Sequence, residues 1–181
     1  MSALAALAVV PAVLVTGAPA AHAATAVSCT DGSGTLGLSR AVPALLPADV
    51  GFSTTGPVQF GGCSGGGITD AQVTATGTAL AALCVPVADS FVTAGMAGTL
   101  TVTWSGGAGP ATTTFNWTSV AAVQVAPGLS AVQISGVSTG GRFHDGGTPA
   151  LFTSTASLGF GSCAQGATSV TLSGDFLVTN V

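Results

Sequence analysis

The sequence predicts an all-β fold, an antiparallel β-sandwich stapled by two disulfides. Short runs rich in Val, Thr, Phe and Ile alternate with Gly, Ser and Pro breaks along most of the chain, as in proteins built from many short strands. Helical signals are nearly absent, because the apolar cluster 41–48 (AVPALLPA) contains two prolines that allow at most one helical turn. An even number of cysteines, four, supplies the two disulfides.

Residues 1–23 have the features of an export signal peptide, which leaves residues 24–181 as a single domain. An apolar stretch over residues 3–15 precedes Gly and Pro helix breakers, and residues 21–23 (AHA) form an A-x-A cleavage box. No Lys or Arg precedes the apolar stretch, so either the start codon is placed too far downstream or the leading segment is neutral. No later apolar run is long enough to span a bilayer. We therefore expect a secreted, extracellular protein without a membrane span.

The cysteines Cys29, Cys63, Cys84 and Cys163 all follow the cleavage box. In an exported protein an even cysteine count indicates disulfides, and the spacing here contains no CxxC pair and no zinc-ligand pattern. Three connectivities are open. We favour Cys29–Cys63 with Cys84–Cys163, where each bridge closes a long loop and contributes about 4 kcal/mol in the chain-entropy model.

The strands follow from runs of β-branched and aromatic residues bounded by turn residues. No repeat of fixed period and no linker divides the domain. The expected strands cover residues 26–30, 34–38, 57–62, 71–79, 87–93, 98–105, 111–118, 121–126, 130–137, 150–159, 167–173 and 175–180.

The segments 98–105 and 111–118 form a hairpin whose register can be predicted. Apolar and threonine side chains alternate along both segments, so each has an apolar face and a hydroxyl face. A four-residue loop keeps like faces together and places Leu100 opposite Phe115, whereas a five-residue loop mixes the faces. The four-residue loop also turns both tryptophans of the chain into the core and leaves a threonine ladder outside.

The chain is poor in charge. It has two arginines (Arg40 and Arg142) and six aspartates, with no Lys, Glu or Tyr, and 4% of its residues are charged. Ordinary soluble domains carry roughly 25% charged residues. Nucleic-acid binding is excluded, because phosphate recognition needs clustered Lys and Arg. Acid–base catalysis also has few groups to draw on.

The densest polar site lies in the glycine-rich loop 140–147, which contains Arg142, His144 and Asp145. Arg142 can clamp a carboxylate or sulfate, with His144 donating a hydrogen bond beside it, which makes these three residues the candidate ligand-binding site. The alternative is that Arg142 pairs with Asp145 and fastens a turn between strands. We favour this structural role.

Two further motifs look functional but lack the structural context they need. Residues 32–37 (GSGTLG) match the dinucleotide-binding pattern G-x-G-x-x-G, which requires a helix after the glycines, and no helix of useful length follows. Residues 62–66 (GCSGG) match the nucleophile pattern G-x-S-x-G around Ser64, but another predicted strand follows in place of a helix. We therefore predict no catalytic residue, no cofactor and no metal site.

Two stretches resemble a known group of proteins. Residues 98–118 (GTLTVTWSGGAGPATTTFNWT) and 134–143 (ISGVSTGGRF) are similar to uncharacterised, secreted actinobacterial β-sandwich proteins, in which a G-T-x-T-V-T-W-S hairpin precedes a G-x-V-x-x-G-x-F turn. The resemblance implies an exported immunoglobulin-like sandwich with no assigned chemistry. A weaker resemblance is to the enediyne-binding apoproteins related to neocarzinostatin, which are acidic, four-cysteine sandwiches whose cysteines close shorter loops.

Together these observations predict a secreted, non-catalytic structural or interaction module with an unknown extracellular partner. An alternative is a small-ligand carrier with an apolar pocket of about 300–1,000 Å³ between the sheets. A third, less favoured alternative is a secreted hydrolase that brings His144 beside Ser64 and an aspartate.

Overall fold

The computed structural model is built from antiparallel strands. It describes residues 26–85, 90–109, 111–119, 123–126, 128–144, 148–159 and 166–180, and no helix occurs in these segments. Accordingly, no helix in this part of the chain is long and apolar enough to cross a membrane. The strands are β1 (Ala26–Leu38), β2 (Ala48–Thr54), β3 (Val58–Ser64), β4 (Ile68–Val85), β5 (Ser90–Val92), β6 (Gly95–Gly106), β7 (Thr112–Ser119), β8 (Val123–Ala126), β9 (Leu129–Gly141), β10 (Ala150–Gly159) and β11 (Ser169–Asn180).

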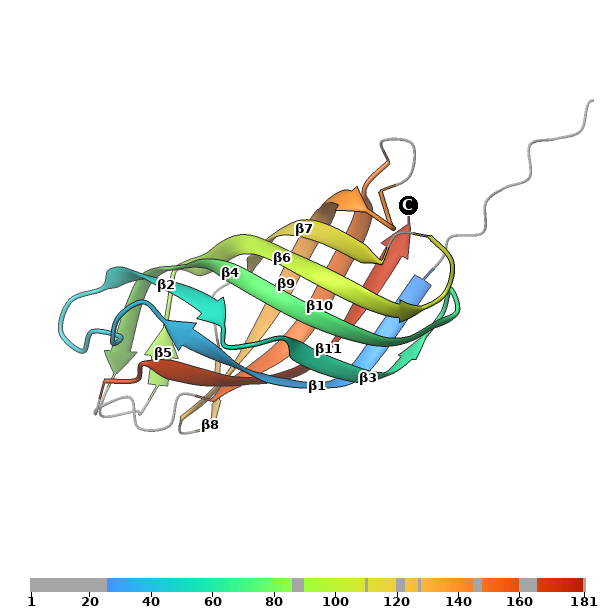
Figure 1. Ribbon diagram of the computed structural model, residues 1–181. Coiled ribbons are helices and arrows are strands. Elements are labelled where there is room, and N and C mark those ends of the chain that lie inside the picture. The colour runs from blue at the N-terminus through green and yellow to red at the C-terminus, as the bar shows by residue number, and fades with distance from the viewer. Residues whose placement is uncertain are drawn as a thin grey trace, which may run out of the picture.

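The strands close into a barrel (Figure 1). Neighbours pair in the order β10, β11, β1, β2, β4, β6, β7 and β9, and β9 pairs with β10 to complete the ring. The two-sheet sandwich expected from the sequence is therefore not confirmed, because a sandwich has facing sheets with unpaired edges. Barrels and sandwiches share the same inward and outward alternation of side chains, so alternation does not distinguish them.

The strands β2 and β3 share one position in the ring. Both run antiparallel to β1 and to β4, β2 beside one half of these long strands and β3 beside the other. The strand β2 was not predicted, and its inward apolar side chains are Val50 and Phe52, separated by a glycine. The strands β1 and β11 were each predicted as two shorter strands. The break in β1 is a bulge, where Asp31 has a φ of 59° and the pairing with β11 shifts register.

The hairpin of β6 and β7 confirms the predicted register. Leu100 lies opposite Phe115, and the backbone N–H of Trp104 donates to the carbonyl of Ala111 at 2.7 Å. Both tryptophans are buried. The threonine ladder faces outward as predicted, and Thr76 and Thr99 join β4 to β6 through their hydroxyls at 3.2 Å.

Aromatic side chains fill one part of the barrel interior. Phe143 packs edge-on against Trp104 with ring centroids 5.1 Å apart, and Trp104 contacts Phe176 at 5.9 Å. Phe176 in turn packs against Phe60 at 4.7 Å and Phe152 at 5.5 Å. These contacts join β3, β6, β10, β11 and the turn after β9, so the rings hold distant parts of the chain together.

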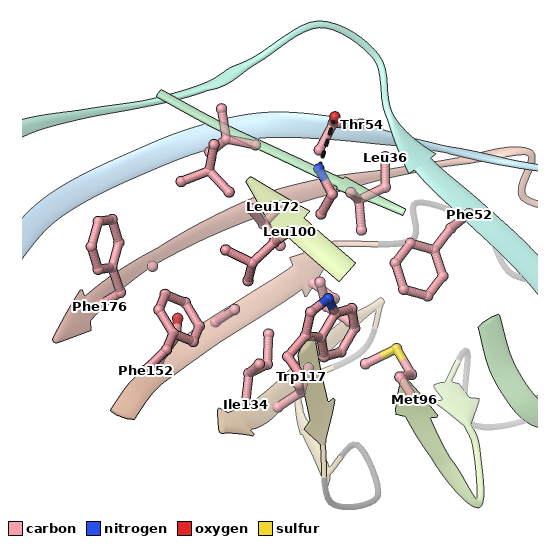
Figure 2. A pocket seen from close by; sticks show the side chains of 18 of the residues that line it. Leu36, Phe52, Thr54, Met96, Leu100, Trp117, Ile134, Phe152, Leu172 and Phe176 are labelled. Atoms are coloured by element: carbon pink, nitrogen blue, oxygen red, sulfur yellow. Dashed lines mark hydrogen bonds between the residues drawn. The ribbon is translucent and has the colours of Figure 1, made fainter. Parts of the chain in front are cut away.

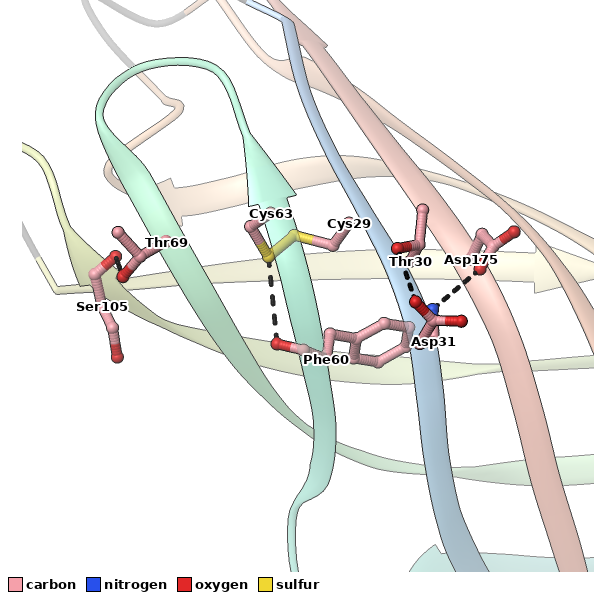
Figure 3. Close-up of a disulfide and its surroundings, with 8 residues drawn as sticks. All are labelled: Cys29, Thr30, Asp31, Phe60, Cys63, Thr69, Ser105 and Asp175. Carbon is pink, nitrogen blue, oxygen red and sulfur yellow. Dashed lines mark hydrogen bonds between the residues drawn. A yellow bond between two sulfur atoms is a disulfide. The ribbon is translucent and has the colours of Figure 1, made fainter.

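The disulfide Cys29–Cys63 confirms one of the two predicted bridges (Figure 3). It ties β1 to β3 where their pairing is irregular, because the register shifts between Ser28 and Thr30. None of the described cysteines has a free thiol. The second predicted bridge, Cys84–Cys163, includes Cys163, which lies outside the described residues.

Candidate functional site

The turn after β9 carries Arg142 to one end of the barrel. This end, called the Arg142 end below, is formed by the β3–β4, β6–β7 and β9–β10 connections. Although arginine is usually exposed, Arg142 is only 9% exposed. Its backbone N–H donates to the Thr112 carbonyl at 2.9 Å, and its Nη1 donates to the Gly106 carbonyl at 2.9 Å. Arg142 thus fastens the turn after β9 to the β6–β7 connection.

The apolar surroundings of Arg142 explain its burial. Its guanidinium carbon lies 5.9 Å from the centre of the Phe143 ring, within the range of a cation–π contact. On the other side it packs directly against Gly107, so close that a Cβ on that glycine would overlap the guanidinium Nη2 atom. Arg142 is therefore enclosed by groups that fix its position, as expected for a structural residue.

His144 is bound to a second backbone group at the Arg142 end. Its Nδ1 atom lies 3.1 Å from the Ser138 carbonyl oxygen and 3.3 Å from the Ser138 hydroxyl. A carbonyl oxygen can only accept, so the Nδ1 atom acts as a donor in this contact. The hydroxyl of Ser138 donates to the Phe143 carbonyl at 2.9 Å and accepts from the Ala150 N–H at 2.8 Å. Ser138 is thus the centre of a buried polar cluster that closes the turn.

Two of the three residues of the predicted ligand site, Arg142 and His144, lie among the described residues. Arg142 and His144 lie in the same turn, but their side chains donate hydrogen bonds to different backbone carbonyls. Arg142 donates to the carbonyl of Gly106, and His144 donates to that of Ser138. The predicted partner of Arg142, Asp145, lies outside the described residues. Among the described residues, the Gly106 carbonyl is the hydrogen-bond acceptor for the Arg142 side chain. This bond fastens the turn after β9 to the β6–β7 connection, and the pairing of Arg142 with Asp145 stays a prediction.

The two motifs that look functional lie in strands and turns. Residues 32–37 form part of β1, where a Cβ on Gly32 would overlap the ring of Phe60, so that glycine lets an aromatic side chain pack against the backbone. Ser64 ends β3 and lies opposite Ser28 in β1, and β4 follows after a short turn. Neither motif precedes a helix, which both functions require.

The barrel interior contains an apolar cavity that is smaller than the pocket expected for a small-ligand carrier. Inward side chains from the barrel strands enclose an apolar cavity of about 70 Å³ (Figure 2). Its volume lies well below the range of about 300–1,000 Å³ that is usual for sites holding drug-sized ligands. The lining includes Phe52, Met96 and Trp117. No local pattern could have located this space, because it depends on how side chains from distant strands fit together.

Comparison with known proteins gave no match to a family model, to a curated protein or to a solved structure.

Proposed function

We propose that the protein is an exported, non-catalytic, disulfide-stapled barrel that acts as a structural or interaction module. The observation that carries the proposal is the use of its scarce polar groups. Arg142 and His144 donate hydrogen bonds to the carbonyls of Gly106 and Ser138, so they serve the fold. The hydroxyl beside His144, that of Ser138, donates to the Phe143 carbonyl, so its proton is not held by the imidazole as in an activated nucleophile.

The geometry around Ser64 supports the same proposal. A serine nucleophile requires a base that accepts its proton, and the base in turn requires an orienting group. Ser64 is exposed at the end of β3 beside the disulfide-bonded Cys63, whereas His144 is directed at Ser138 in β9. No group of three or more His, Cys, Asp or Glu side chains that could hold a metal ion occurs among the described residues.

Export and the second disulfide belong to the same proposal. A disulfide persists in an oxidising compartment, and Cys29–Cys63 agrees with such a location. The A-x-A box at residues 21–23 supplies the expected cleavage point. Intact mass of the secreted protein tests both statements. We expect a chain that begins at Ala24 and is about 4 Da lighter than after reduction, because each bridge removes two hydrogens.

Hydrolysis assays test the absence of catalysis. The purified protein is assayed with p-nitrophenyl esters, a peptide amide and p-nitrophenyl glycosides, alongside the variants His144→Gln and Ser64→Ala. Glutamine keeps a side-chain N–H that can donate to the Ser138 carbonyl, so the turn should be preserved. We expect all three proteins to match the buffer rate. Turnover by the wild-type protein that falls tenfold or more in either variant would overturn the proposal.

A further inference from the structure

The cavity in the barrel contains an unpaired hydrogen-bond donor. Trp117 is 5% exposed and lines the cavity, and its indole Nε1 has no hydrogen-bond partner among the described residues. Figure 2 shows the nitrogen on the edge of the ring that faces the neighbouring lining residues Leu36 and Leu100. A buried donor without an acceptor costs about 1–3 kcal/mol. The unpaired Trp117 donor therefore lowers the stability of the barrel, and a ligand that accepts a hydrogen bond from it would remove this loss.

The other tryptophan shows the usual arrangement. Trp104 is buried to the same extent, and its Nε1 donates to the Thr113 hydroxyl at 2.9 Å. Both residues are inward-facing and lie in the same hairpin. The missing partner is therefore a particular property of the Trp117 site, and Trp104 provides an internal control within the same hairpin.

The other polar side chains of the cavity already have partners. The hydroxyl of Thr54 accepts from the Ala75 N–H at 3.3 Å, and the hydroxyl of Ser154 donates to the Asp175 carbonyl at 2.8 Å. A buried water needs two to four polar partners. A water beside Trp117 would accept a hydrogen bond from this indole, but the lining is largely apolar. The water would therefore have fewer polar partners than a buried water needs.

The volume and the lining define the class of ligand. An apolar cavity of about 150 Å³ holds benzene, which has six non-hydrogen atoms, and on the same scale the cavity here, at about 70 Å³, has room for roughly three. No charged side chain of the described residues lines it, so an ion would be buried without compensation. We propose that the interior of the barrel binds a small neutral molecule with an apolar body and one acceptor atom, such as a two-carbon aldehyde, which accepts a hydrogen bond from Trp117 Nε1.

This site is separate from the proposed module function, because it needs neither catalysis nor a macromolecular partner. A failure of the ligand proposal would leave the hydrolysis assays unaffected, and the reverse also holds.

Two-dimensional ¹H–¹⁵N NMR of the indole groups tests the proposal. The chain has two tryptophans and therefore two indole N–H signals. The protein is titrated with acetaldehyde and, separately, with dissolved propene, in which a methylene group replaces the carbonyl oxygen. We expect acetaldehyde to shift the Trp117 signal with saturation, while the Trp104 signal stays in place. The hydrocarbon should bind about 3- to 10-fold more weakly, which is the usual net effect of one hydrogen bond.

Two variants assign the effect to the cavity. Trp117→Phe should bind acetaldehyde no better than propene, as monitored by methyl signals of Leu36 and Leu100. Ala156→Val adds two methyl groups at the cavity wall and should abolish the saturable shift of Trp117. The wild-type comparison alone remains decisive if either variant fails to fold. Equal, non-saturating shifts of both indole signals, or equal affinity for the two probes, would overturn the proposal.

Discussion

The guanidinium group of Arg142 fills the space that a side chain on Gly107 would need. Gly107 also has a φ of 68°, a left-handed conformation that costs other residues about 1–2 kcal/mol. We expect Gly107→Ala to lower the free energy of unfolding by about 2–4 kcal/mol, because backbone strain and displacement of Arg142 add together. Urea unfolding measures the change.

Gly61→Ala is the matched control for this substitution. Gly61 lies in β3, no atom lies within 4 Å of the position that an added methyl group would take, and its φ is not in the left-handed region. Its free energy of unfolding should change by less than about 1 kcal/mol. Equal effects of the two substitutions would contradict the close packing of Arg142 on Gly107.

The two tryptophans should respond differently to replacement by phenylalanine. Trp104→Phe leaves the buried Thr113 hydroxyl without its hydrogen-bond donor, whereas Trp117→Phe removes a donor that has no partner among the described residues. Both substitutions remove a similar volume from the interior. We expect Trp104→Phe to be more destabilising by about 1–3 kcal/mol. A double-mutant cycle with Thr113→Val should show coupling to Trp104 and none to Trp117.

The hydroxyl of Ser138 should stabilise the turn that closes the Arg142 end. It bonds to the Phe143 carbonyl and the Ala150 N–H, and it is buried. Ser138→Ala should cost about 1–3 kcal/mol, because the polar groups around it lose a partner. Ser135→Ala, at an exposed position of the same strand, should change stability by less than about 0.5 kcal/mol. Thermal unfolding that separates the two variants by only a fraction of a degree would refute this role.

Removal of the Cys29–Cys63 bridge should weaken the barrel without changing its fold. The two cysteines are separated by 34 positions, for which the chain-entropy model gives about 4 kcal/mol. We therefore expect the double substitution Cys29→Ala and Cys63→Ala to unfold at a clearly lower urea concentration. Ser64→Ala, an exposed neighbour, is the control. A stability equal to that of the wild-type protein would show that the bridge does not constrain the unfolded chain.

Local patterns predicted those parts of the fold that local chemistry determines. The β6–β7 register followed from matching apolar faces across a short loop, and the structure confirms Leu100 opposite Phe115. Closure of the barrel depends on pairing between β1 and β11 and between β9 and β10, which alternation along a strand does not specify. The strand β2 was missed because only Val50 and Phe52 mark its inward face.

That Arg142 and His144 share one glycine-rich loop was evident from the sequence, but what surrounds their side chains was not. A glycine-rich loop with Arg142 and His144 indicates a solvated turn, because charged residues are mostly exposed. In the structure the turn folds over the barrel end, since Phe143 packs on Trp104 and brings Arg142 with it. The unpaired Trp117 Nε1 was beyond prediction, because the two tryptophans have similar neighbours in the sequence and differ only in what lies across the barrel.

The free energy of unfolding of Arg142→Met tests most directly whether the scarce polar groups serve the fold. Methionine has a similar reach but cannot donate to the Gly106 carbonyl, so the substitution removes the hydrogen bond and the contact of the charge with Phe143. A structural role predicts a loss of about 1–3 kcal/mol in urea unfolding. Residues kept for binding or catalysis often reduce stability. An unchanged or increased free energy of unfolding would therefore contradict the account.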